Sequence, residues 1–408
     1  MSMVLRHPRG VAIVAAAAGI ALCLVLVVVA SADASRQATA IGLIATMNAP
    51  SEVPAPTGDV SVARGAFTAT ASQDGTGAGL DWTMSFSGLT GPATAAHIHV
   101  APRGQPGPVV VPLCAPCTSP ASGTASVDAA TLAAIQAGGA YVNVHTDRNR
   151  AGEIRGQVGI AAPVRTALTA AREVPKPKGN VRRATGSLVA TVTKEGTTGA
   201  VAWRLTFARL TGPAVAAHIH VAPRGQPGPV VVPLCAPCSS PASGTANLDA
   251  TLLAAIQAGG AYVNVHTDRN RAGEIRGQVG ITAPLRTALG SRQEVPKPKG
   301  NVRRSTGSFV ATVAKEGTTG AVTWRLTFAR LTGSALAAHI HIGRAGRAGP
   351  VAVALCGPCR NGQRGSAVLN AATLAALEAG RGYVNIHTKR NPAGEVRGQL
   401  PAAALRIG

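Results

Sequence analysis

The sequence predicts an all-β protein of three tandem antiparallel domains of the Greek-key sandwich or barrel type, each with one short helix. Three observations predict this class. Landmark residues recur every 121 positions, each 121-residue unit contains many short segments of alternating apolar and polar residues, and glycines or prolines separate those segments. A period of two is typical of half-buried strands, and many short strands joined by such turns favour a sandwich or barrel.

The 121-residue period is unbroken along the chain. Trp82 recurs as Trp203 and Trp324, and a tyrosine, three histidines and a Cys-x-x-Cys pair keep the same step. The unit is longer than a solenoid repeat of about 20–50 residues and has the size of a whole domain, about 100–150 residues. We therefore predict three domains, called repeats 1, 2 and 3, at residues 41–160, 161–281 and 282–408.

The elements expected within a unit are clearest in repeat 2. A helix is expected over residues 248–258, because Asp249 can cap its start and the Gly259–Gly260 pair can end it. Apolar or alternating segments predict strands over residues 186–193, 200–207, 217–221, 229–233, 262–266 and 274–279.

The chain begins with a basic segment followed by an apolar one. Arginines precede an uncharged run over residues 11–30, and Ser31-Ala-Asp-Ala then offers a small-x-small cleavage site after Ala34. This order is typical of a secretory signal peptide, while a run of about 20 apolar residues can also remain as an anchor. We interpret residues 1–34 as a signal peptide or an N-terminal membrane anchor. The repeats are therefore expected to be extracellular, periplasmic or on the cell surface.

Charge is distributed unevenly within the net +22 of the chain. Counted over the ranges above, repeat 1 has a net charge of −2, repeat 2 of +8 and repeat 3 of +14. This gradient favours anionic cell-surface polymers or another extracellular protein as partners. Nucleic acid is disfavoured, because aromatic residues make up only 3% of the chain and no recognition helix is visible. Membrane contact is expected only through the N-terminal segment.

Nine of the ten histidines belong to the repeating pattern, as one His-x-His pair and one later histidine in each unit. Alternate side chains of a strand share a face, so the two histidines of the pair lie together. If the strand of the later histidine is a neighbour, three imidazoles converge, and such a set suits zinc or copper. The alternative is a hydrogen-bonded polar cluster without a metal. The candidate ligands are His97, His99, His145, His218, His220, His266, His339, His341 and His387.

Each unit also has one Cys-x-x-Cys pair. In an exported protein such a pair favours a local disulfide. Thiolates that join the histidines in a zinc site are the weaker alternative, because each unit has only one pair, and a thioredoxin-type role lacks its βαβ setting. The expected disulfides join Cys114 to Cys117, Cys235 to Cys238 and Cys356 to Cys359.

A Gly-Glu-x-Arg-Gly-Gln segment near the end of each unit places a glutamate and an arginine on one face of a strand. The two can pair with each other, orient a histidine by hydrogen bonding behind it, or attract an anion. Pairing is the preferred interpretation. No nucleophile elbow, P-loop or paired-carboxylate motif is present, so no catalytic residue is assigned. The residues concerned are Glu153, Arg155, Glu274, Arg276, Glu395 and Arg397.

Together these motifs resemble the CHRD domain, the module named for chordin and found in many bacterial exported proteins. The resemblance rests on Ala-Ala-His-Ile-His, on Tyr-Val-Asn-Val-His-Thr and on Ala-Gly-Glu-Ile-Arg-Gly-Gln, and it covers each unit from end to end. It also includes the Glu-Val-Pro segments that start at Glu52, Glu173 and Glu294. It implies an extracellular β-domain and assigns no activity.

A more distant similarity is to copper–zinc superoxide dismutase, which also runs Gly-Leu-Thr-Gly into a His-x-His strand and places a copper-binding histidine later. The similarity implies copper as the ion bound by the nine histidines. This chain lacks the histidine that bridges copper and zinc, the zinc ligands and the distant disulfide partner. Arg155, Arg276 and Arg397 fall close to, but not on, the position of that family's anion-guiding arginine.

Three functions are compatible with these observations. The preferred one is a non-enzymatic, exported binding or surface module with a three-histidine metal site in each repeat, since acid–base motifs are missing. The first alternative is a copper-dependent redox enzyme of the dismutase type. The second is a multivalent cell-wall or matrix adhesion protein, because linked modules bind more tightly than single ones.

Overall fold

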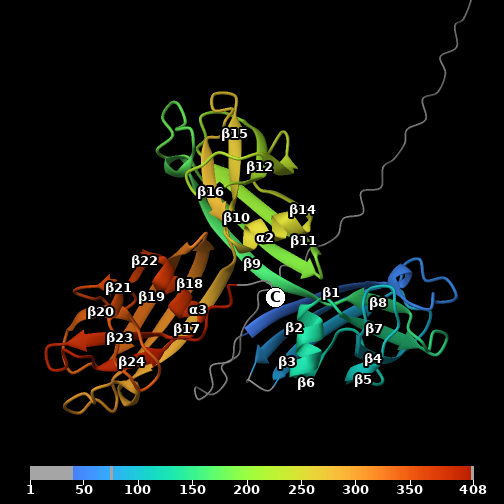
Figure 1. Ribbon diagram of the computed structural model, residues 1–408, viewed down its shortest axis with the longest axis horizontal. Coiled ribbons are helices and arrows are strands. Elements are labelled where there is room, and N and C mark those ends of the chain that lie inside the picture. Colours follow the sequence, from blue (N-terminus) through green and yellow to red (C-terminus); the bar gives the residue numbers. More distant parts are fainter. Residues whose placement is uncertain (1–39, 74–76, 406–408) are drawn as a thin grey trace, which may run out of the picture. The chain divides into compact units, whose positions relative to one another are not determined.

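The computed structural model describes residues 40–73 and 77–405, and strands dominate all three repeats (Figure 1). Every pairing between named strands in this part of the chain is antiparallel, and each repeat has one short α-helix. The predicted fold class is thereby confirmed. The segment interpreted as a signal peptide or anchor lies outside the described residues. No helix within the described part is long and apolar enough to cross a membrane.

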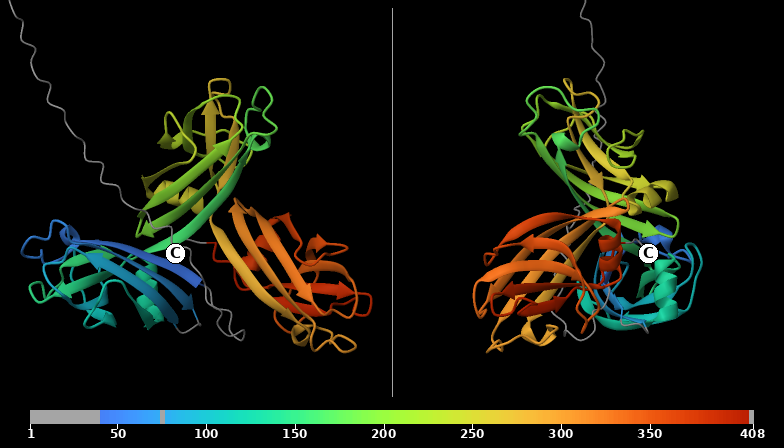
Figure 2. Two further views of the ribbon diagram at one scale, coloured as in Figure 1. Left: turned by 180° about the vertical axis from the view of Figure 1, so that it is seen from behind. Right: turned by 60° about the vertical axis from the view of Figure 1, so that its left-hand side comes forward.

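Repeat 1 shows the topology that the other two repeat. Its elements are β1 (Ala40–Asn48), η1 (Ala49–Ser51), β2 (Arg64–Gln73), β3 (Gly77–Ser87), β4 (Ala93–Val100), β5 (Val109–Cys114), β6 (Ala121–Asp128), α1 (Ala129–Gln136), β7 (Ala140–Thr146) and β8 (Ile154–Gln157). The strands are hydrogen-bonded in the order β6-β3-β2-β1-β8-β7-β4-β5. Because β3 pairs with β6 and β4 with β7, the chain crosses between layers as in a Greek key (Figure 2).

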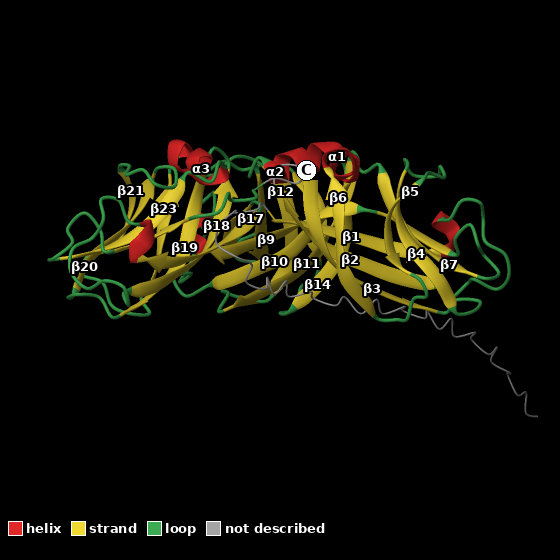
Figure 3. Ribbon diagram, turned by 90° about the horizontal axis from the view of Figure 1, so that it is seen from below, coloured by secondary structure: helices red, strands yellow, loops and turns green. Residues whose placement is uncertain are grey.

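Repeats 2 and 3 have the same elements in the same order. Figure 3 shows the helices α1, α2 and α3 in red among the yellow strands. Repeat 2 contains β9 (Gly159–Thr169), η2 (Ala170–Arg172), β10 (Thr185–Glu195), β11 (Thr198–Ala208), β12 (Ala214–Val221), β13 (Val230–Cys235), β14 (Ala242–Leu248), α2 (Ala250–Gln257), β15 (Ala261–Thr267) and β16 (Ile275–Val279). Repeat 3 contains β17 (Thr282–Gly290), η3 (Ser291–Gln293), β18 (Thr306–Glu316), β19 (Thr319–Ala329), β20 (Ala335–Ile342), β21 (Val351–Cys356), β22 (Arg364–Leu369), α3 (Ala371–Glu378), β23 (Gly382–Thr388) and β24 (Val396–Gln399).

The helix predicted for repeat 2 is present as α2. Its N-cap is Asp249, whose carboxylate accepts a hydrogen bond of 2.8 Å from the backbone N–H of Leu252. The helix ends before Gly259, which adopts a positive φ of 69° that glycine reaches without strain. Both ends therefore lie where the sequence places them.

An apolar core lies between the two layers of each repeat. In repeat 1, Phe67 and Trp82 of one layer and Ile98 and Val142 of the other belong to one cluster and are at most 4% exposed. Each such side chain contributes about 1.5–3 kcal/mol by its burial. Since Ile98 and Val142 point inwards, their chain neighbours on β4 and β7 point to the outer face of that layer.

Repeats 1 and 2 share a strand. β9 pairs with β1 through its first three residues, 159–161, and with β10 through residues 160–169. The predicted boundary after residue 160 therefore falls inside one continuous strand, and no linker separates the two sheets there.

Candidate metal site

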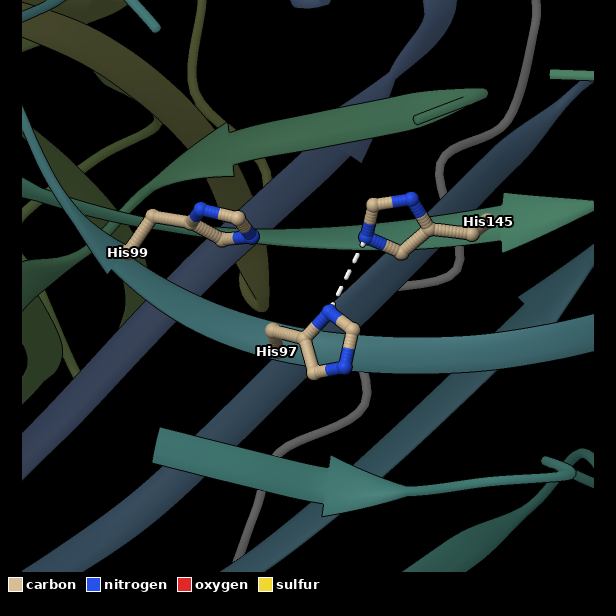
Figure 4. Close-up of side chains that lie close together, drawn as sticks. All are labelled: His97, His99 and His145. Carbon is tan, nitrogen blue, oxygen red and sulfur yellow. Dashed lines mark hydrogen bonds between the residues drawn. The ribbon is translucent and has the colours of Figure 1, made fainter. Parts of the chain in front are cut away.

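The three histidines of repeat 1 converge on the outer face of the β4–β7 pair. His97 and His99 come from β4, where the fully buried Ile98 points to the opposite side, and His145 comes from β7. The two strands are neighbours, as the expected convergence requires: β4 residues 97 and 99 pair with β7 residues 143 and 141. Figure 4 shows the three rings pointing toward one another. One nitrogen from each ring lies within 4.8 Å of the other two.

Backbone carbonyls fix the tautomer of two of these rings. Nδ1 of His99 lies 2.9 Å from the Gly107 carbonyl, and Nδ1 of His145 lies 2.9 Å from the Arg150 carbonyl. A carbonyl can only accept, so each Nδ1 carries the hydrogen and each Nε2 keeps its lone pair. This is the arrangement by which proteins orient metal-binding histidines.

The third ring, that of His97, faces the ring of His145 through Nδ1. Nδ1 of His97 is 3.1 Å from Nε2 of His145. Because Nε2 of His145 has no hydrogen, the proton between the two rings belongs to His97. In the other neutral tautomer of His97, which carries its hydrogen on Nε2, the set has three lone pairs, on Nδ1 of His97 and on Nε2 of His99 and His145.

Burial keeps the cluster neutral. Removal from solvent lowers the pKa of all nine clustered histidines below the ordinary value, and it lowers the pKa of His266 and of His339 to about 4. Neutral imidazole is the form that binds metals, so the rings are in the ligating state at pH 7.

One nitrogen in each cluster is buried and unpartnered. Nε2 of His99 has no hydrogen-bond partner, and the same is true of Nε2 of His220 and of His341. A buried polar atom without a partner costs about 1–3 kcal/mol, which an ion bound to its lone pair would offset. The three imidazoles of each cluster can together hold a metal ion.

A stacked tyrosine and arginine support the second ligand of each cluster. The rings of His99 and Tyr141 are stacked with centroids 4.7 Å apart and planes inclined by 7°. The guanidinium carbon of Arg155 lies 3.4 Å from the centre of the same tyrosine ring. These separations leave no room for both groups on one face, so the tyrosine is held between them. Recurrence at the 121-residue step is the one sign in the sequence that this tyrosine belongs to the site.

The arginine of this stack does not pair with the glutamate two residues before it. Arg155 is 1% exposed and donates to the carbonyls of Gln105 and Pro102, at 2.9 and 3.1 Å. Glu153 is fully buried and accepts hydrogen bonds from Thr90, Thr146 and Asn149 instead. The preferred pairing is therefore wrong, because Glu153 precedes β8 and faces the loops rather than the strand face.

The glutamate holds the segment that follows the third histidine. Burial raises the pKa of Glu153, but the hydrogen bonds from Thr146, Thr90 and Asn149 outweigh it, and the pKa stays below its ordinary value. Thr146 directly follows His145, so the carboxylate fixes the backbone beside this ligand without touching the ring. The equivalent glutamates, Glu274 and Glu395, have the same partners.

A second buried carboxylate lies close to the cluster. The carboxylate of Glu52 and the amide of Asn143 both lie against Gly152, where a Cβ atom would come within 2.2 Å of Glu52 Oε2 and 2.7 Å of Asn143 Nδ2. Gly152 also has a φ of +134°. Only glycine fits this position, which explains the glycine before each Glu-x-Arg segment.

The cysteine pairs form the three expected disulfides, Cys114–Cys117, Cys235–Cys238 and Cys356–Cys359. Disulfide sulfurs are not thiolates, so the alternative of cysteines that complete a zinc site is wrong for this state of the chain.

The other repeats reproduce the cluster closely. The Nδ1–Nε2 distance is 3.1 Å between His218 and His266 and 3.0 Å between His339 and His387. The tyrosine stacks recur with His220 on Tyr262 and His341 on Tyr383. In repeat 3 the last histidine is held by the carbonyl of Pro392. All three sites therefore offer the same donors.

Among known protein families, the CHRD domain matches the chain three times, over residues 43–158, 164–279 and 285–400. No curated protein and no solved structure matches the chain.

Proposed function

The chain belongs to the CHRD domain family, and on that basis we propose that it is an exported, non-enzymatic module that binds one copper or zinc ion in each of its three repeats. The observation that carries the proposal is the fixed tautomer of the ligand set. The carbonyls of Gly107 and Arg150 leave Nε2 of His99 and of His145 with a lone pair each, and one nitrogen from each of the three rings lies within 4.8 Å of the other two.

The donor set favours copper over zinc. Three imidazoles suit both ions, and the Irving–Williams order places copper above zinc for the same ligands. Zinc is the alternative where copper is scarce. When bound, either ion would be held by Nδ1 of His97 and Nε2 of His99 and His145.

A binding role is supported by the surroundings of the cluster. The arginine that resembled an anion guide, Arg155, is buried between a tyrosine and two carbonyls and is not free to attract an anion. The buried carboxylate of Glu153 accepts hydrogen bonds from the Thr90 N–H and the Thr146 hydroxyl rather than from the histidine rings. These contacts favour retention of an ion over turnover of a substrate.

Export is supported by the disulfides and by the N-terminal sequence. Three local disulfides are typical of proteins that fold in an oxidising compartment. The basic and apolar order of residues 1–34 fits a segment that directs or anchors such a protein.

The test is metal analysis of the whole exported chain. After copper or zinc loading and extensive dialysis, we expect three ions per chain in the wild type and two in the His218→Ala variant. Repeats 1 and 3 act as internal controls, because failure of the whole chain to fold would remove more than one ion, and unchanged near-ultraviolet circular dichroism excludes a local failure in repeat 2. Equal, near-zero metal in both proteins would overturn the proposal. Superoxide consumption by the copper-loaded chain well above that of free copper would overturn the non-enzymatic part alone.

A further inference from the structure

One end of repeat 3 carries seven exposed cationic side chains on three loops. We call this set the basic crown. The loops are residues 294–305, the turn after β19 and the turn after β23. The crown residues are Lys297, Lys299, Arg303, Arg304, Arg330, Lys389 and Arg390.

Direct contacts hold two of the loops together. The side chain of Asn391 accepts from the Lys299 N–H at 2.6 Å and donates to the Lys299 carbonyl at 3.3 Å. The guanidinium of Arg390 lies over Gly300, where an added Cβ would come 2.9 Å from Nη1. Cations from both loops therefore occupy one continuous surface.

A buried carboxylate ties in the third loop. Glu395, fully buried, accepts from Ser305 at 2.8 Å, from the Thr332 N–H at 2.7 Å and from Asn391 at 3.1 Å. The Ser305 hydroxyl is also 2.8 Å from the carbonyl oxygen of Arg330, so its single hydrogen is shared between the two acceptors. Because these partners are neutral donors, the carboxylate organises the loops without pairing with any crown cation.

The crown includes an arginine in a backbone conformation that favours glycine. Arg330 has a φ of +58°, and Arg209 at the matched position of repeat 2 has a φ of +59°. Repeat 1 has Gly88 there, with a φ of +71°. A side chain in the left-handed region costs about 1–2 kcal/mol. Two of the repeats therefore tolerate strain to place a cation where glycine would be unstrained.

Repeat 1 is a natural comparison without a crown. At the seven matched positions it has one cation and one carboxylate, and repeat 2 has six cations and one carboxylate. The residues of repeat 1 are Ala55, Thr57, Ser61, Val62, Gly88, Asp147 and Arg148. The fold and the histidine cluster are the same in all three repeats, so neither requires the crown.

We infer that the basic crown of repeat 3, and the six matched cations of repeat 2, bind a linear phosphate-bearing polymer outside the cell. The crown of repeat 2 consists of Lys176, Lys178, Arg182, Arg183, Arg209 and Arg269. In repeat 3, seven exposed cations without a neighbouring exposed acid create a positive potential that attracts a polymer with a negative charge on each unit; in repeat 2, six cations surround the single exposed acid Asp268. Four of the seven crown cations in repeat 3 are arginines. Their planar guanidinium groups can each donate two parallel hydrogen bonds to the oxygens of one phosphate. Two crowns on one chain add avidity for a long polymer.

The crown is less suited to insertion into a membrane. Within the described chain, none of the exposed large apolar side chains belongs to the crowns of repeats 2 and 3. Proteins that insert into the lipid interface present apolar or aromatic residues beside their cations. The crown cations are not ligands in the histidine cluster, although the turn after β23 also carries the Pro392 carbonyl that orients His387.

The test compares two variants of the full exported chain with equal net charge. The crown variant gives repeat 3 the residues of repeat 1 through Lys297→Ala, Lys299→Thr, Arg303→Ser, Arg304→Val and Arg330→Gly. The control removes five exposed arginines elsewhere in repeat 3, again to repeat 1 residues, through Arg286→Ile, Arg325→Thr, Arg360→Thr, Arg364→Ser and Arg381→Gly. The probe is long-chain inorganic polyphosphate, with polyglutamate and phosphatidylglycerol vesicles as comparators.

We expect the crown variant to bind polyphosphate at least about 10-fold more weakly than wild type, and the control to change by less than about threefold. Equal losses in both variants would overturn the inference, because net charge alone would explain them. Tighter wild-type binding to polyglutamate or to vesicles would overturn the phosphate-polymer assignment. Unchanged near-ultraviolet circular dichroism and metal content show that both variants are folded.

Discussion

The ring of Tyr141 lies flat against the ring of His99, with 4.7 Å between centroids and 7° between planes. The tyrosine hydroxyl also accepts from the Gly107 N–H at 3.2 Å, and the Gly107 carbonyl holds Nδ1 of His99. One aromatic side chain therefore fixes both the plane of a metal-binding ring and the loop that sets its tautomer.

Loss of this stack should weaken metal binding in one repeat only. Tyr141→Leu removes the stacking surface, and we expect about 10–100-fold weaker copper binding at the first site, as for other residues that orient ligands. Tyr141→Phe keeps the stack and should change the affinity much less. A chelator competition titration measures this, with repeats 2 and 3 as unaltered sites. Equal affinities for the leucine and phenylalanine variants would show that the stack has no orienting role.

Glu274 should be a large contributor to the stability of repeat 2. It is fully buried and accepts from the Thr211 N–H, Thr267 and Asn270, so Glu274→Ala leaves several buried donors without a partner. We expect a loss of about 2–4 kcal/mol in the free energy of unfolding, measured by urea denaturation. The control Asp268→Asn alters a side chain that is 76% exposed and should change it by less than about 0.5 kcal/mol.

Glu173 should make repeat 2 less stable as pH rises. Burial raises its pKa to about 7 from 4.5. Between these values the folded chain holds a proton that the unfolded chain releases, so its contribution is full below pH 4.5 and is lost as pH rises through 7. Glu173→Gln should therefore be more stable than wild type at pH 8 by about 1–3 kcal/mol, with little difference at pH 4. A difference that does not vary with pH would contradict this assignment.

Gly273 should not tolerate a side chain. It has a φ of +129°, and a Cβ atom would come 2.3 Å from Glu173 Oε2 and 2.7 Å from Asn264 Nδ2. We expect Gly273→Ala to lower the free energy of unfolding by at least about 2 kcal/mol. Gly212→Ala is the matched control, because no atom lies within 4 Å of its Cβ position. Thermal unfolding of the two variants side by side measures the difference.

The sequence predicted the strands of the histidine cluster because their alternation is regular. Ile219 between two histidines, and two valines before His266, fix which face is buried, and all six strands expected in repeat 2 are present. Two other strands of repeat 2 were not predicted. β14 consists mainly of small residues with little strand preference, and β9 continues from the preceding unit without a turn that would mark its start.

The supporting contacts of the cluster could not be predicted, because they join loops that are distant in sequence. Glu153 bonds Thr90, which is 63 positions away, and Arg155 donates to a carbonyl 50 positions away. The shared strand face of Glu153 and Arg155 suggested a pair instead. Alternation places residues on a face but does not say which loop covers that face.

The strand β9 determines how copies of the unit are joined. Its first residues pair with β1 of repeat 1, and residues 160–169 pair with β10 of repeat 2. A fragment cut at residue 158 would lack this last pairing and would expose part of the β1 edge. At the junction of repeats 1 and 2 the chain thus passes from one copy to the next without a stretch of unpaired backbone, whereas at the next junction Ile281 forms an isolated bridge with Val164.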